Sequence, residues 1–169
     1  MNGPLAEIFR YNRWAMLTLL EACRGLSDEH LDARVAGTSG TVREMLLHVV
    51  GGQQTFVLRT MGRQHEGELN RSSVWPRFDA LIDVARLTSD QLLRIAEGLA
   101  EDADVDLPYL GQVYRYPVSF FLAHAAEHGV AHRTEIKLAL AQLGVETPDL
   151  DAWHYAGAAG HGQVVSPRP

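Results

Sequence analysis

Apolar residues recur every three or four positions along most of the chain, which is the spacing of one buried face of an α-helix. One such run begins at Pro4 and stops before Gly25, and another begins at Thr41. Thr41 and Glu44 have the spacing of a capping box, in which each side chain accepts a hydrogen bond from the other residue's backbone N–H. Four long helices are therefore predicted, at residues 4–24, from 41 through 56, at 78–99 and at 118–143.

The segments between these runs predict the connections. Residues 62–76 mix glycine, charged and polar residues without a helical period, so we expect a long crossover along the helices. Residues 105–117 place a glycine-containing turn between two β-prone runs, which is the pattern of a small hairpin. Short accessory helices are expected at residues 27–31 and 149–156. The expected fold class is all-α, a four-helix bundle with a long connection between its second and third helices.

Composition sets bounds on the rest. A chain of 169 residues with 46% hydrophobic content suits one domain, predicted over residues 1–158 with a flexible C-terminal tail at 159–169. The formal net charge is −6 and the basic residues are dispersed, so neither nucleic acid nor a membrane is expected as a partner. Cys23 is the single cysteine and lies in a helical pattern, which favours a small core residue over a catalytic thiol. The chain start lacks a signal-peptide pattern and no apolar run reaches about 20 residues, so a cytoplasmic protein is expected.

Three histidines four residues apart carry the candidate chemistry: His124, His128 and His132. Residues at i and i+4 share a helix face, so His128 and His132 can bind one metal ion. His124 lies roughly 12 Å from His132 along the helix axis, too far for both to reach an ion held at about 2.0–2.1 Å. His48, on the apolar face of the second helix, is the best placed third ligand. Taken alone, a histidine on such a face is more often a hydrogen-bonded core residue.

Several other residues are candidates for the surroundings of this site. Glu44 lies one turn before His48 and is the expected partner for an imidazole N–H. His124 is expected either beside the ligands or in the pocket wall. Tyr11 and Trp14 are aromatic core candidates that could also line the pocket mouth. The remaining candidates are Arg133 and Glu135. Arg133 could equally form a surface ion pair, and Glu135 could equally be a solvated charge on the helix surface.

Three familiar motifs are absent from the sequence. Gly129 follows His128, so the pattern is not the His-Glu-x-x-His of zinc proteases. No Glu-x-x-His pair suggests a di-iron carboxylate centre. The Gly51-Gly52 pair lies inside a helical pattern and does not follow a strand, so it is no phosphate loop. One mononuclear site with three histidines remains.

Four segments resemble the DinB-like superfamily, also described as DinB/YfiT metalloenzymes and unrelated to the DNA polymerase of the same name. They are RYNRWAMLTLLEACRGLSDEHLDARV, VREMLLHVVGGQQTF, HAAEHGVAHRTEI and LGVETPDLDAW. The resemblance implies a four-helix bundle that usually forms a homodimer. It also implies a divalent metal ion, commonly zinc or nickel, on His48, His128 and His132. After the His-Arg pair the family often has Gly-Gln, whereas this chain has Thr134-Glu135. No role of the family's glutamine is therefore assigned to Glu135.

The resemblance also implies a class of chemistry. Characterised relatives activate a low-molecular-weight thiol for transfer to electrophiles or for isomerisation, whereas many members have no known reaction. An ion with three protein ligands keeps a position open for a thiol or for water. The leading hypothesis is therefore a metal-dependent thiol S-transferase acting on a small-molecule substrate, with a hydrolase as the nearest enzymatic alternative. A bundle that binds a metal or small ligand without turnover, as a sensor, storage module or scaffold, is the alternative from another class.

Overall fold

The computed structural model describes residues 3–64 and 68–162. Within them lie the helices and strands α1 (Pro4–Cys23), α2 (Asp28–Asp32), α3 (Val42–Arg59), α4 (Arg77–Gly98), β1 (Asp104–Tyr109), β2 (Gln112–Pro117), α5 (Val118–Gln142) and α6 (Ala152–Ala158). The predicted bounds of α1, α4 and α5 differ from these by at most one residue, whereas α3 ends three residues later than predicted. The last short helix begins later than expected because the Asp151 side chain caps it, accepting hydrogen bonds from the backbone N–H groups of Trp153 and His154.

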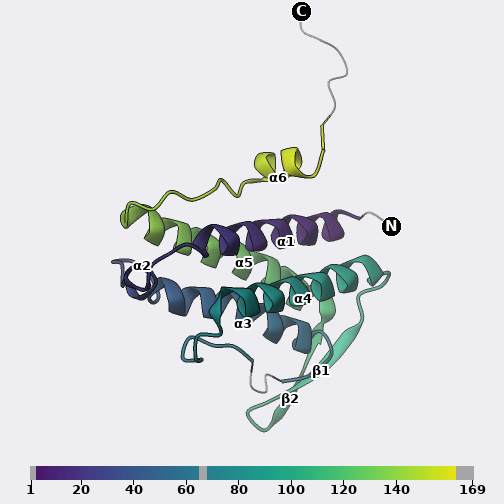
Figure 1. Ribbon diagram of the computed structural model, residues 1–169. Coiled ribbons are helices and arrows are strands. Elements are labelled where there is room, and N and C mark those ends of the chain that lie inside the picture. Colours follow the sequence, from purple (N-terminus) through teal and green to yellow (C-terminus); the bar gives the residue numbers. More distant parts are fainter. Residues whose placement is uncertain (1–2, 65–67, 163–169) are drawn as a thin grey trace, which may run out of the picture.

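The four long helices pack side by side (Figure 1), with α1 against α4, α3 against α5, and further contacts between α3 and α4 and between α1 and α5. Ion pairs fix the direction of α4 relative to α1. Arg24, at the end of α1, pairs with Asp79 at the start of α4, whereas Arg10 pairs with Glu97 near its end. The two helices are therefore antiparallel. The crossover after α3 runs back along the molecule, so that α3 and α4 point in the same direction (Figure 1).

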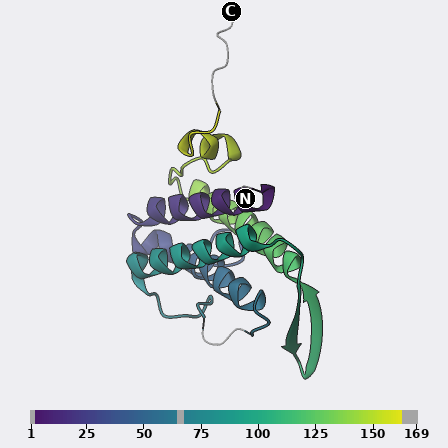
Figure 2. The ribbon, with the colours of Figure 1, turned by 90° about the vertical axis from the view of Figure 1, so that its right-hand side faces the viewer.

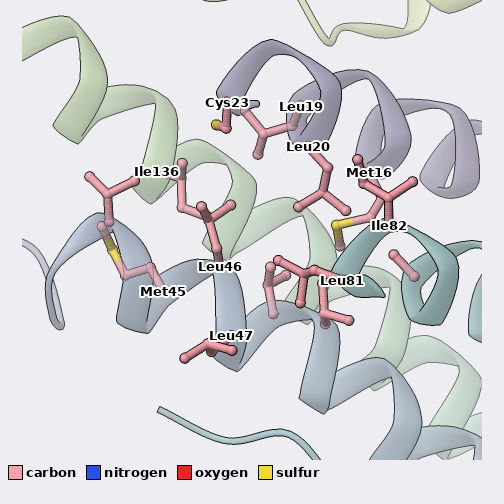
Figure 3. Packing of buried hydrophobic residues seen from close by; sticks show 14 of the residues in the cluster. Met16, Leu19, Leu20, Cys23, Met45, Leu46, Leu47, Leu81, Ile82 and Ile136 are labelled. Carbon is pink, nitrogen blue, oxygen red and sulfur yellow. The ribbon is translucent and has the colours of Figure 1, made fainter. Parts of the chain in front are cut away.

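Two groups of buried side chains stabilise this arrangement. In the larger group, α1, α3, α4 and α5 contribute Met16, Leu46, Leu81 and Ile136, and each of these is fully buried (Figure 3). The smaller group contains Phe9, Phe56, Val57, Leu92, Ala96, Val118, Leu122 and Ala125. Cys23 belongs to the larger group, where burial raises the pKa of its thiol to about 12. It is therefore a core residue, as the sequence pattern favours, and not a nucleophile.

The small hairpin requires a correction to the all-α prediction, because the protein is mostly helical with one two-stranded antiparallel sheet. Its strands pair from Asp104 opposite Pro117 to Tyr109 opposite Gln112. Leu110 and Gly111 both have positive φ, as a two-residue hairpin turn requires. The hairpin extends away from the helices and leads directly into α5 (Figure 2). The local prediction of a hairpin is thus confirmed, although the fold class needs the sheet added.

The C-terminal segment returns to α1 after the end of α5. The Tyr155 hydroxyl donates a hydrogen bond to Glu7 over 2.7 Å, and the Tyr11 hydroxyl donates to the carbonyl of Leu150 over 2.7 Å. The predicted tail at 159–169 stays a prediction, since residues 163–169 lie outside the described residues. None of the described helices is long and apolar enough to cross a membrane.

Replacing Leu46 with alanine should lower the free energy of unfolding by about 2–5 kcal/mol, because a fully buried leucine leaves a cavity. Leu138→Ala on α5 is the matched control, since Leu138 is 51% exposed. The control should change stability by no more than about 0.5 kcal/mol. Urea denaturation of both variants measures the difference. Equal losses would contradict the assignment of Leu46 to the core.

Candidate metal centre

Three imidazoles from two helices meet at one point. His48 lies on α3, and His128 and His132 lie one turn apart on α5. The Nε2 atom of His48 is 3.1 Å from that of His132 and 3.2 Å from that of His128, and one nitrogen of each ring lies within 4.8 Å of the other two. Two nitrogens bound tetrahedrally to one zinc ion are roughly 3.3 Å apart. The spacing of these donors therefore fits a single divalent ion.

A carboxylate orients one of the rings. The Oε2 atom of Glu135 is 2.8 Å from Nδ1 of His132. A carboxylate at this distance places the proton of a neutral imidazole on Nδ1, and so leaves the Nε2 lone pair free for a metal ion. The other carboxylate oxygen of Glu135 accepts a hydrogen bond from the backbone N–H of Ser39. The loop before α3 thereby holds the carboxylate that orients His132.

Glu44 does not take the orienting position that the sequence analysis gives it. Its Oε2 atom accepts a hydrogen bond from the backbone N–H of Thr41 over 2.7 Å and pairs with Arg34 at 3.1 Å. The capping box is complete, because Thr41 also accepts a hydrogen bond from the N–H of Glu44. The reason is local, since the third helical residue bends back to the cap and cannot also reach an imidazole one turn ahead. Glu135 makes the imidazole contact instead.

The glycine pair in α3 makes room for the site. A Cβ atom on Gly52 would lie 2.4 Å from Cε1 of His128. A Cβ atom on Gly51 would lie 1.7 Å from the carbonyl oxygen of Leu69, in the crossover. The crossover is held there by Gln54, which accepts a hydrogen bond from the N–H of Leu69 over 3.0 Å. Gly52 thus admits the His128 ring, and Gly51 admits the crossover segment.

A hollow of about 410 Å³ leads to the histidines from the surface. We call it the access hollow. Its lining residues come from α3, α5 and the crossover, and they are His48, Gly51, Gly52, Thr55, Phe56, Arg59, Leu69, Asn70, His124 and His128. The His124 ring lies 4.6 Å from that of Phe56, between centroids, and belongs to the wall rather than to the group of three. The structure therefore separates His124 from the candidate ligands, as the helix geometry predicts.

Burial keeps the candidate ligands neutral. It lowers the pKa of His48 from the usual 6.5 to about 4, and the positive charge of Arg71 and the nearby His132 act in the same direction. Burial likewise lowers the pKa of His128 to about 3, with further lowering from the neighbouring histidines. Both rings are neutral at pH 7. Neutral imidazole is the form that binds metal ions.

Tyr11, Trp14 and Arg133 lie elsewhere, beside α6 and the segment that precedes it. The rings of Tyr11 and Trp14 pack against Tyr155 of α6, at 5.8 and 5.7 Å between centroids. Arg133 is 3% exposed and donates a hydrogen bond from Nη2 to Asn12 over 2.8 Å, so it is not a surface ion-pair residue. With Tyr11 it borders a separate hollow next to Leu150. Neither aromatic residue lines the access hollow.

The chain and its fold are similar to known proteins. The model of the DinB family matches residues 1–164. The chain belongs to the DinB family. A DinB-like protein from Bacillus cereus has a similar solved structure, with 21% identity, a TM-score of 0.63, and coverage of 86% of this chain and 94% of that one. The DinB-like protein YjoA from Bacillus subtilis is 20% identical, with a TM-score of 0.60 and coverage of 88% and 99%.

At these identities the two DinB-like structures support the fold and carry no activity to this chain. No match was found among curated proteins. The structure also adds Arg59, at the end of α3, to the candidate site residues. Sequence reasoning missed it because its place depends on which faces of α3 and α5 border the hollow. The glycine pair was the available signal, since glycine inside a helix usually has a packing or functional reason.

Gly52→Ala should weaken metal binding by about tenfold or more, because the new Cβ atom displaces the His128 ring. The helix itself should not suffer, since alanine has the higher helix propensity. The matched control is Gly157→Ala in α6, where nothing lies within 4 Å of an added Cβ atom. Metal affinity is measured by competition with a chelating dye, and helicity by circular dichroism. Unchanged affinity in Gly52→Ala would contradict this placement of the ring.

The metal-free protein should lose stability as the pH falls from about 6.5 to about 4. In this window unfolded histidines take up protons, whereas native His48 and His128 stay neutral, so the unfolded state binds more protons. Urea denaturation along a pH series measures the slope. The double variant His48→Gln, His128→Gln should show a smaller loss over the same window. An identical slope in the variant would show that these rings are not protected from protonation.

Proposed function

We propose that this protein is a metal-dependent enzyme that binds a divalent ion, zinc or nickel, through His48, His128 and His132. The observation that carries the proposal is the convergence of three imidazole nitrogens within 4.8 Å of one another, next to a hollow of about 410 Å³. Three nitrogen ligands and an open position are the arrangement of catalytic zinc sites, whereas structural sites have four protein ligands. The hollow gives a small molecule a path to the open position.

The chemistry proposed for the open position is activation of a thiol, which would lose its proton to solvent, form a bond from its sulfur to an electrophile and displace the electrophile's leaving group. A bound divalent ion lowers the pKa of a coordinated thiol or water, and so supplies a nucleophile near neutral pH. The residues of the chain prepare this step. Glu135 fixes the His132 ring, and burial keeps His48 and His128 neutral. Phe56 and His124 form a wall of adjacent aromatic rings that favours an organic thiol in the hollow.

Elemental analysis and turnover test this proposal together. Purified protein should contain about one divalent ion per chain, since three histidines form one mononuclear site. With metal bound, it should consume a small thiol in the presence of a model electrophile. His128→Ala should reduce both metal content and turnover by more than about a hundredfold, because loss of an outer partner alone costs 10–100-fold. The control His154→Ala changes an exposed histidine on α6, and it should leave metal content and turnover unchanged.

The other outcomes separate the alternatives. Turnover of a model ester without thiol consumption would support the hydrolase that activates water. Stoichiometric metal without any turnover would support the binding bundle that acts as a sensor or scaffold. Absence of bound metal, even after supplementation with zinc and nickel, would refute the site.

A further inference from the structure

The access hollow has a cation at its outer end. Arg59 lines it, and the guanidinium carbon lies 5.9 Å from the centre of the Phe56 ring. Many arginines in this chain pair with carboxylates, for example Arg13 with Asp90 at 2.6 Å. Within the described residues, the Arg59 side chain makes no hydrogen bond or ion pair, and it lines the hollow. An arginine with unused planar donors at a pocket is a candidate receptor for a carboxylate or phosphate.

The charge of the hollow has one sign. Among its described lining residues, Arg59 is the charged side chain and none is acidic. Outside the lining, Arg71 adds a positive charge that lowers the pKa values of both His48 and His128, while the Glu135 carboxylate beside His132 acts in the opposite direction on His48. A concave surface with one sign of charge concentrates ligands of the opposite sign. The hollow is therefore suited to an anion.

The spacing along α3 defines the shape of that anion. The guanidinium of Arg59 lies over the ring of Phe56. Phe56 follows His48 by eight residues, or roughly 12 Å along the helix axis. Because α5 runs antiparallel to α3, His124 lies against Phe56 while His128 lies against Gly52. The passage between the histidines and Arg59 is thus lined by aromatic rings. A ligand that spans it has a metal-binding donor at one end, a slender apolar middle and an anionic group at the other end.

We propose that Arg59 is a specificity-determining residue that pairs with the anionic group of an elongated substrate whose donor atom reaches the three histidines. The substrate class is then an organic carboxylate or phosphate with its reacting group on the order of 10 Å from the anionic group. This inference rests on the proposed function, because it assigns the far end of the same site. Arg59 binds and positions the substrate and takes no part in bond making.

Cobalt-loaded protein and paired thiols test this inference by binding rather than by turnover. Cobalt occupies sites built from imidazoles, and its visible spectrum reports a bound thiolate. Mercaptooctanoate should bind about tenfold more tightly than mercaptooctanol, because a charge-assisted hydrogen bond to Arg59 forms only with the carboxylate. Mercaptoacetate and mercaptoethanol are too short to reach Arg59 and should bind with similar affinity. The preference for the long carboxylate should weaken as salt is added.

Variants of Arg59 show whether the preference belongs to this residue. Arg59→Gln should abolish it while leaving binding of mercaptooctanol unchanged, and Arg59→Lys should restore part of it. Arg63→Gln is the control for a general loss of positive charge, because Arg63 borders a different hollow next to α4 and should keep the full preference. Phosphate-terminated thiols with the same spacer separate a phosphate from a carboxylate as the preferred group.

The possible failures are distinguishable. If cobalt does not bind, or binds without a thiolate spectrum, the proposed function fails. If cobalt and thiols bind but the long carboxylate has no advantage, Arg59 is not the anchor and this inference alone is refuted. An advantage that persists in Arg59→Gln would likewise refute it.

Discussion

The close packing of α3 against α5 is the constraint on which the site depends. The two helices are antiparallel, and Gly52 removes the side chain that would otherwise lie 2.4 Å from the His128 ring. This contact allows a histidine of α3 to meet two histidines of α5 with nitrogens 3.1 and 3.2 Å apart. Buried apolar residues of the same two helices, such as Leu46 and Ile136, hold them at this distance. The core and the candidate metal centre are therefore built from the same two helices.

Burial sets the protonation state of two of the rings, and a hydrogen bond orients the third. Desolvation lowers the pKa values of His48 and His128 to about 4 and 3, so both stay neutral without a carboxylate partner. His132 differs, because the Glu135 carboxylate lies within hydrogen-bond distance of Nδ1 and is itself held by the backbone N–H of Ser39. Nitrogen lone pairs that face one another repel unless a cation or a proton lies between them. Two rings kept neutral at pH 7 are thus better matched to a metal ion than to a proton.

Sequence reasoning reached the features that depend on local periodicity. The i, i+4 spacing fixes the relation of His128 to His132, and the apolar neighbours of His48 predict which way its ring points. Glu44 shows where one local rule overrides another, since the capping box that marks the start of α3 also occupies its carboxylate. Arg59 could not be found in this way. Its place in the access hollow depends on the pairing of α3 with α5 and on the crossover between α3 and α4, which are contacts between distant segments.

The parallel direction of α3 and α4 allows the proposed metal binding and the proposed choice of substrate to be separate properties. Because α3 and α4 point in the same direction, the chain between them must run back along the length of the helices. It passes over Gly51, where the carbonyl oxygen of Leu69 approaches α3. Leu69 and Asn70 of the crossover line the access hollow, whereas the three candidate ligands all belong to α3 and α5. Loops accept substitutions more readily than packed helices. Changes in the crossover can therefore reshape the hollow while the packing that brings the histidines together stays intact.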